Sequence, residues 1–202
     1  REGKASENAI LTDRVIDRPM RPLFPKDYRN DVTLNNLVMS VDQDCSPELT
    51  AMLGSAIATA ISDIPFDGPC AMTQVGMVDG EFVFNPTAAQ KAVSDLSLTV
   101  ASTRNKVIMI EAGANEVPED KMIEAIFAAH DVNQTIIEFI DKIVAECGKP
   151  KHAYISCAVP DELMAAIKEI VPPEAMEEAV FTDDKQTREE NIRQIKEKIN
   201  EI

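Results

Sequence analysis

Two apolar segments around Asp79-Gly80 constrain the fold of this chain more than any other feature. Residues 70–78 and 81–84 have the composition of β-strands, and a two-residue Asp-Gly connection is typical of a tight hairpin. Two more segments of alternating apolar residues follow at 96–100 and 107–112, with a short polar turn between them. Consecutive strands with short connections predict an antiparallel sheet in the middle of the chain.

Helical patterns precede and follow these strands. Residues 6–18 are the first predicted helix, with Ser6 as its N-cap. A second helix is predicted from Ser46 to Ser62, because Pro47 suits the first helical position and apolar residues recur at helical spacing. Its many small residues predict close packing against the sheet. Helices and strands in this order indicate the α+β class, with a mixed or antiparallel sheet and packed helices.

The remaining elements of the first part are predicted with two irregularities. Residues 32–41 alternate like a strand, apart from one phase slip that indicates a bulge. The longest helical region is predicted to begin at Pro118, where acidic residues favour a helix N-terminus. We expect this helix to break near residues 131–133 and to end at Gly148.

The character of the chain changes after Lys149. Short helical patterns flank Pro172-Pro173, and residues 184–201 are charged almost throughout. Their sparse apolar stripe predicts a helix that needs a partner from outside the chain. We interpret residues 1–150 as a core domain and residues 151–202 as an incomplete all-α segment.

Arginines gather at the start of an otherwise acidic chain. The net charge is −15, yet the first 29 residues hold seven Lys or Arg against five Asp or Glu. Arg14, Arg18 and Arg21 have the spacing i, i+4, i+7, which places them on one face of a helix. Three guanidinium groups on one face match the oxygens of a phosphate chain. The alternative is a salt-bridged helix end, with Asp13 and Asp17 as partners.

Prolines and aromatic residues follow these arginines. We expect Pro19 to end the helix early and Arg18, which precedes it, to be extended. Arg21 then lies on the following turn. Phe24 and Tyr28 offer either stacking surfaces for bases or, for Phe24 above all, core packing.

Several functional classes find no support in the sequence. There is no C-x-x-C pair, so the cysteines are expected to be free thiols in a reducing, cytoplasmic compartment. No apolar run approaches membrane-spanning length, and we expect no membrane association. The two histidines, His130 and His152, lack Cys or acidic neighbours at metal-ligand spacing. We therefore assign no catalytic residue and no metal ligand within this chain.

Residues 10–25 read ILTDRVIDRPMRPLFP and carry the pattern Arg-x-Ile-Asp-Arg-Pro-x-Arg-Pro-Leu-Phe. This pattern closely resembles the first RNase PH-like core domain of the polynucleotide phosphorylase family. The resemblance covers essentially the whole chain and continues through residues 64–69 (IPFDGP), 85–87 (NPT), 147–150 (CGKP) and 182–188 (TDDKQTR). It implies an RNase PH-like core, related to domain 2 of ribosomal protein S5, followed by the start of a helical linker domain. Because the chain opens on Arg1 without Met, we expect a fragment.

The function that the resemblance implies is reversible phosphorolysis, in which phosphate attacks the 3′-terminal linkage of RNA and releases nucleoside diphosphates. It places Mg²⁺ and phosphate in a second core domain and makes the intact protein a homotrimer that acts with other RNA-degradation proteins. It matches Arg1 to a loop at the central pore, and Arg14, Arg18 and Arg21 to the RNA path. We therefore expect RNA or phosphate binding at these residues and no activity of the fragment alone.

Two other interpretations stay open. The first is a non-catalytic RNA-binding or scaffold module of related fold. The second is a stand-alone RNase PH relative, which is disfavoured because a helical segment after Gly148 is not expected there.

Overall fold

The computed structural model describes residues 3–200. The chain divides into two compact units, Arg1–Ile155 and Ser156–Ile202, which are described separately. The first unit contains the sheet and the helices packed on it, and the second contains helices alone. The assignment of residues 1–150 and 151–202 to a core domain and a helical linker domain stays a prediction.

The first unit is built on a four-stranded antiparallel sheet with the strand order β2-β1-β3-β4. Its strands are β1 (Ala71–Val78), β2 (Glu81–Phe84), β3 (Leu96–Ser102) and β4 (Val107–Ala114). Asp79 and Gly80 both have positive φ values, 51° and 82°, as a tight hairpin turn requires. The predicted hairpin and antiparallel sheet are therefore confirmed.

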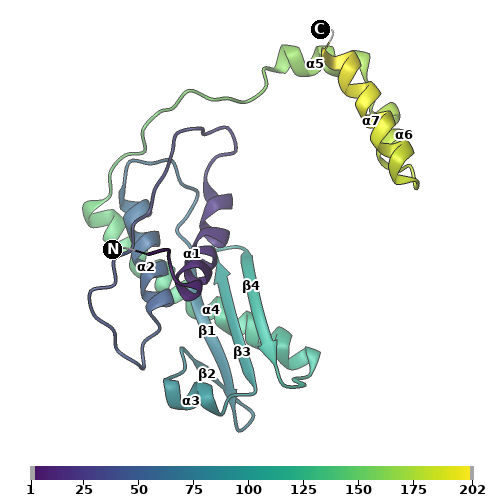
Figure 1. Cartoon of the computed structure of the whole chain (residues 1–202). Helices are drawn as coiled ribbons and strands as arrows, with labels where there is room; N and C mark the ends of the chain where they lie inside the picture. Colours follow the sequence, from purple (N-terminus) through teal and green to yellow (C-terminus); the bar gives the residue numbers. More distant parts are fainter. Residues whose placement is uncertain (1–2, 201–202) are drawn as a thin grey trace. The chain divides into compact units, whose positions relative to one another are not determined.

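Helices lie on both sides of this sheet (Figure 1). They are α1 (Glu7–Met20), the 3₁₀ turn η1 (Arg21–Leu23), α2 (Pro47–Ile61), α3 (Ala88–Ala92) and α4 (Glu119–Cys147). The long helix α4 packs across β1 and β3 on one face, and α1 lies over the other face near β4. The helix α2 contacts β1, α1 and α4 and joins the two layers at their side.

Alternation along the strands gives the sheet two different faces. Val75, Leu98 and Val100 point to α4, where they pack against Ala125 and Ala129, two alanines that let the helix approach closely. The opposite face is apolar only at one end. There Cys70, Met72, Ala101 and Met109 are buried in one cluster with Ile16 and Met20 of α1 and Met52 of α2.

The predicted break in the long helix near residues 131–133 is wrong, because α4 is continuous. Asn133 is fully buried against the sheet. Its side-chain oxygen accepts a hydrogen bond from Thr73 Oγ1 at 2.8 Å, and its Nδ2 donates to Val100 O at 3.1 Å and Ser102 Oγ at 3.0 Å. These tertiary contacts satisfy a residue whose own helix propensity is poor.

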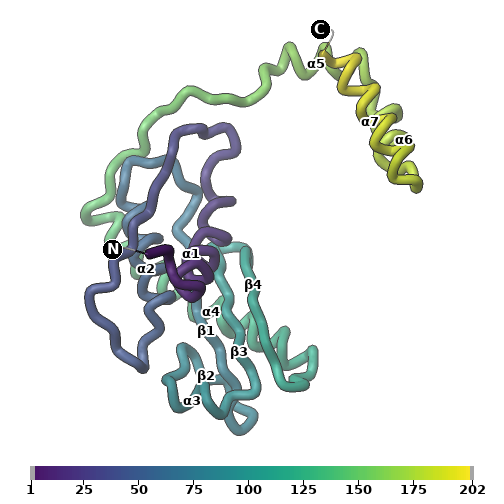
Figure 2. The backbone as a smooth tube through the Cα atoms, in the orientation of Figure 1, coloured from purple at the N-terminus to yellow at the C-terminus, as the bar shows by residue number. Residues whose placement is uncertain are grey.

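The predicted strand over residues 32–41 is also wrong. Figure 2 traces this segment as part of a long irregular connection between η1 and α2. Leu37 and Met39, two of its alternating apolar residues, are 84% and 89% exposed. A strand needs a neighbour for its backbone groups, and within residues 3–200 no strand pairs with this segment.

Helix α1 differs from its prediction at the C-terminal end. Ser6 caps it as expected, since its hydroxyl accepts a hydrogen bond from Ala9 N–H at 3.2 Å. The helix then continues through Pro19 to Met20, so Arg18 is helical rather than extended. Pro19 and Met20 are buried in the last turn, and this burial outweighs the single backbone hydrogen bond that a proline removes.

The segment that follows α4 is tied back onto the first unit. Lys151 Nζ donates hydrogen bonds to the carbonyl oxygens of Thr59 (3.1 Å), Ala60 (2.9 Å) and Ser62 (2.8 Å) at the C-terminal end of α2. A cation in this position complements the negative end of the helix dipole. Burial lowers the pKa of Lys151 from its ordinary value. Tyr154 adds a hydrogen bond of 2.8 Å to the Asp27 carboxylate.

The second unit consists of α5 (Asp161–Ile170), α6 (Pro173–Val180) and α7 (Lys185–Asn200). The predicted helices are present. Its small core joins Val171 and Ala179 to Ile195 of α7. The apolar stripe of α7 thus finds partners within the chain, contrary to the expectation that it needs an outside helix.

Candidate nucleic-acid interface

The candidate interface is the face of α1 that carries Arg14, Arg18 and Arg21. Because the helical backbone continues through Pro19 into η1, the spacing i, i+4, i+7 does place these residues on one side. All three side chains are exposed. Arg1, the fourth arginine of the predicted set, lies outside the described residues.

The three arginines differ in their acidic partners. The Arg21 fork binds the Asp17 carboxylate through two hydrogen bonds, Nε to Oδ2 at 2.9 Å and Nη2 to Oδ1 at 2.6 Å. Arg18 Nη1 lies 3.6 Å from Glu111 Oε2 on β4. Arg14 has no hydrogen bond or ion pair within the described part of the chain.

These ion pairs confirm only part of the alternative prediction, a salt-bridged helix end with Asp13 and Asp17 as partners. The expected pairing with Asp17 is confirmed for Arg21. Asp13 forms no ion pair with the arginines among residues 3–200. Glu111 was missed, because its contact with Arg18 joins a helix to a strand far along the chain, and no local pattern marks it.

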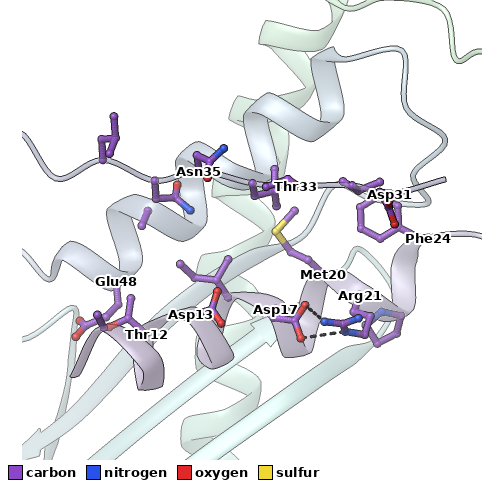
Figure 3. A pocket seen from close by; sticks show the side chains of 18 of the residues that line it. Thr12, Asp13, Asp17, Met20, Arg21, Phe24, Asp31, Thr33, Asn35 and Glu48 are labelled. Atoms are coloured by element: carbon purple, nitrogen blue, oxygen red, sulfur yellow. Dashed lines mark hydrogen bonds and ion pairs between the residues drawn. The ribbon is translucent and has the colours of Figure 1, made fainter. Parts of the chain in front are cut away.

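A cleft with several carboxylates lies beside the arginine face of α1. It has a volume of ≈ 1220 Å³ and runs between α1, residues 24–38 and the start of α2. Figure 3 shows Asp13 and Asp17 along α1, with Asp31 and Glu48 on the neighbouring segments. Arg21, Lys26 and Arg29 also line the cleft, so its charge is mixed and it adjoins the arginine face at Arg21.

The two aromatic residues near the arginines are already packed. The Phe24 ring lies 5.1 Å from the Phe66 ring, centroid to centroid, and Tyr28 meets Tyr154 edge-on at the same distance. The Tyr28 hydroxyl also lies 3.4 Å from His152 Nε2. These contacts indicate structural roles, so base stacking on either ring is not part of the site.

Outside the arginine face, the described part of the chain offers neither a metal site nor an activated thiol at Cys70. Among residues 3–200, no three His, Cys, Asp or Glu side chains lie together as a metal site. Cys70 is buried, and burial raises the pKa of its thiol to about 12, which removes it as a nucleophile. Across the described helices, none is both long enough and apolar enough to cross a membrane.

Comparison with known sequences and structures defines the class of protein. The model of the 3′ exoribonuclease family, domain 1, matches residues 1–65, and that of domain 2 matches residues 68–132. The chain therefore belongs to the 3′ exoribonuclease family. The crystal structure of rice Rrp46 matches with a TM-score of 0.56 at 12% identity, covering 71% of this chain and 69% of that one. This likeness concerns the fold alone, and together with the two family models it confirms the RNase PH-like core.

The relatives in sequence are more specific. Over 202 residues the chain is 84% identical to the polyribonucleotide nucleotidyltransferase of Lachnoclostridium phytofermentans, covering all of this chain and 29% of that protein. It is 51% identical over 197 residues to the same enzyme of Ruminiclostridium cellulolyticum, covering 98% of this chain and 28% of that protein. The resemblance to polynucleotide phosphorylase is confirmed, and the chain spans about 29% of the length of such relatives.

Proposed function

We propose that this chain is part of a phosphorolytic 3′-to-5′ exoribonuclease. The longer protein would split RNA with phosphate into nucleoside diphosphates and run the reaction in reverse as a nucleotidyltransferase. The observation that carries this proposal is the 84% identity over the whole chain to an enzyme named polyribonucleotide nucleotidyltransferase. The match to both domains of the 3′ exoribonuclease family supports it.

Within that enzyme, we assign the arginine face of α1 to the RNA path. Arg14, Arg18 and Arg21 would neutralise backbone phosphates, with Arg1 as a fourth contact outside the described residues. Binding of this kind needs cationic groups that match the spacing of phosphates along an RNA strand. It does not need recognition of the bases. The net charge of −15 supports the assignment, because it repels RNA from most of the surface and leaves few cationic faces.

The chemical step is assigned to the part of the enzyme beyond this chain. The described residues hold no cluster of acidic side chains that fits Mg²⁺, so the metal and the attacking phosphate would bind in a second core domain. We further propose that the enzyme is a homotrimer that works with other RNA-degradation proteins. Its four cysteines are free thiols, which supports a cytoplasmic location.

A phosphorolysis assay tests the proposal. The longer protein and the chain of residues 1–202 are each incubated with poly(A), Mg²⁺ and inorganic phosphate, and released ADP is quantified. We expect phosphate-dependent ADP release by the longer protein and none by residues 1–202. AMP as the product, or no product from the longer protein, would contradict the proposed reaction. ADP release by residues 1–202 would contradict the placement of the chemistry.

A further inference from the structure

The three arginines of α1 are held with very different firmness by their own carboxylates. Arg21 uses two charge-assisted hydrogen bonds of 2.9 and 2.6 Å to Asp17. This pair occupies the Nε–Nη2 edge of the guanidinium and leaves the Nη1 edge open. A phosphate at Arg21 therefore meets a guanidinium whose charge the Asp17 carboxylate already offsets.

Arg18 is paired with a carboxylate more loosely than Arg21 is. Its Nη1 lies 3.6 Å from Glu111 Oε2, which is beyond hydrogen-bond distance but well within the reach of charge attraction. The two side chains are 57% and 55% exposed, so solvent screens the pair and a competing anion has access to it. Arg14, one helical turn away, has no acidic partner in the described chain.

Glu111 is placed by the sheet rather than by α1. It pairs with Thr99 across β3 and β4, and Thr99 in turn pairs with Gln74 of β1. These three polar residues form a row on the face that α1 only partly covers. A strand with a fixed register holds the Glu111 backbone in place, so its carboxylate restrains Arg18 without blocking its guanidinium.

Building on the proposed function, we propose that Glu111 is a positioning residue that holds Arg18 toward the sheet and limits its grip on RNA phosphate. This narrows the set of three arginines assigned to the RNA path: Arg14 and Arg18 make the phosphate contacts, and Arg21 stays with Asp17. An exonuclease that shortens its substrate from one end must release and remake its backbone contacts, and a competing carboxylate favours release. Glu111 thus sets how tightly RNA binds along α1, and it does not determine where RNA binds.

The test is the salt dependence of binding by the longer protein to a fluorescently labelled single-stranded poly(A) oligonucleotide. Each lost phosphate contact makes the slope of log K against log salt shallower by about 0.7. We expect that loss for Arg14→Ala and for Arg18→Ala, and almost none for Arg21→Ala. Glu111→Gln should bind about 2- to 5-fold more tightly at low salt, as loss of a surface ion pair implies.

Two further variants isolate the mechanism. Glu138→Gln removes an exposed carboxylate on α4, across the sheet, and should leave the affinity unchanged. The double variant Arg18→Ala/Glu111→Gln should bind no more tightly than Arg18→Ala, because Glu111 acts through Arg18. If Glu111→Gln matched the unchanged protein while Arg18→Ala flattened the slope, the role of Glu111 would be refuted and the RNA path would stand. Unchanged slopes for both Arg14→Ala and Arg18→Ala would refute the RNA path itself.

Discussion

The two faces of the sheet in the first unit use their polar residues in opposite ways. Toward α4, Thr73 and Asn133 are fully buried and hydrogen-bonded to each other. Toward α1, Thr99 is half-buried and Glu111 is exposed, with Arg18 of α1 at charge-pair distance. One face locks a helix onto the sheet, whereas the other keeps charged groups accessible. In the proposed function, a single sheet thereby separates stability from contact with RNA.

The largest expected effect concerns the apolar, buried end of the sheet face that α1 covers. Cys70 has a thiol pKa of about 12, whereas Cys45, Cys147 and Cys157 are exposed. At pH 8 we expect iodoacetamide to modify Cys70 about 10³-fold more slowly than the other three, because alkylation needs the thiolate. Mass spectrometry of the native and guanidinium-unfolded chain measures this. Rapid modification of all four thiols in the native chain would show that this end is open.

The raised thiol pKa also fixes a pH dependence. An unfolded thiol titrates near pH 8.5, below the folded value of about 12. Between these values the unfolded chain has lost a proton that the folded chain retains, so stability falls as the pH rises. Denaturation at pH 8 and pH 10 should show the loss, and Cys70→Ala should reduce it.

Next in size is the loss of Asn133. Replacement by Ala removes the hydrogen-bond partner of Thr73, Val100 O and Ser102 together. We expect the free energy of unfolding to fall by about 2–4 kcal/mol, since buried polar groups lose their partners and a cavity opens. Urea denaturation of residues 1–202 gives the value, with Asn8→Ala on exposed α1 as the control. A cost equal to that of the control would mean that the network does not hold α4.

A matched pair of threonines gives the sharpest contrast between the faces. Thr73→Val removes a buried donor to Asn133 and should cost about 1–3 kcal/mol. Thr99→Val makes the same chemical change on the open face and should stay within about 0.5 kcal/mol of the unchanged chain. Both variants keep a β-branched strand residue, so β-propensity cancels. Equal costs would remove the distinction between the faces.

Local signals account for the elements that the sequence predicted correctly. The Asp79-Gly80 turn, the Ser6 cap and the Pro47 helix start each depend on residues within a few positions of one another. The arginine spacing and its partner Asp17 are local in the same sense. Such features need no knowledge of the remaining chain.

The errors all involve contacts between distant segments. Apolar and polar residues alternate along residues 32–41 as in a strand, but this alternation does not supply a neighbouring strand. Asn133 looked like a helix breaker because its partners lie on strands that are distant in sequence. Glu111 could not be found as the partner of Arg18 for the same reason. The prediction that Pro19 ends the helix considers only its missing N–H. The burial of Pro19 in the last turn of α1 cannot be seen from the sequence.

The most direct test of the central claim compares salt dependence in two charge-matched triple variants of the longer protein. One replaces Arg14, Arg18 and Arg21 by Ala. The other replaces three exposed lysines by Ala: Lys106, Lys142 and Lys168. For single-stranded poly(A), the slope of log K against log salt should become shallower by about 1.4 in the arginine variant, equivalent to two phosphate contacts, and stay unchanged in the lysine variant. Equal slopes in the two variants would contradict an RNA path along α1.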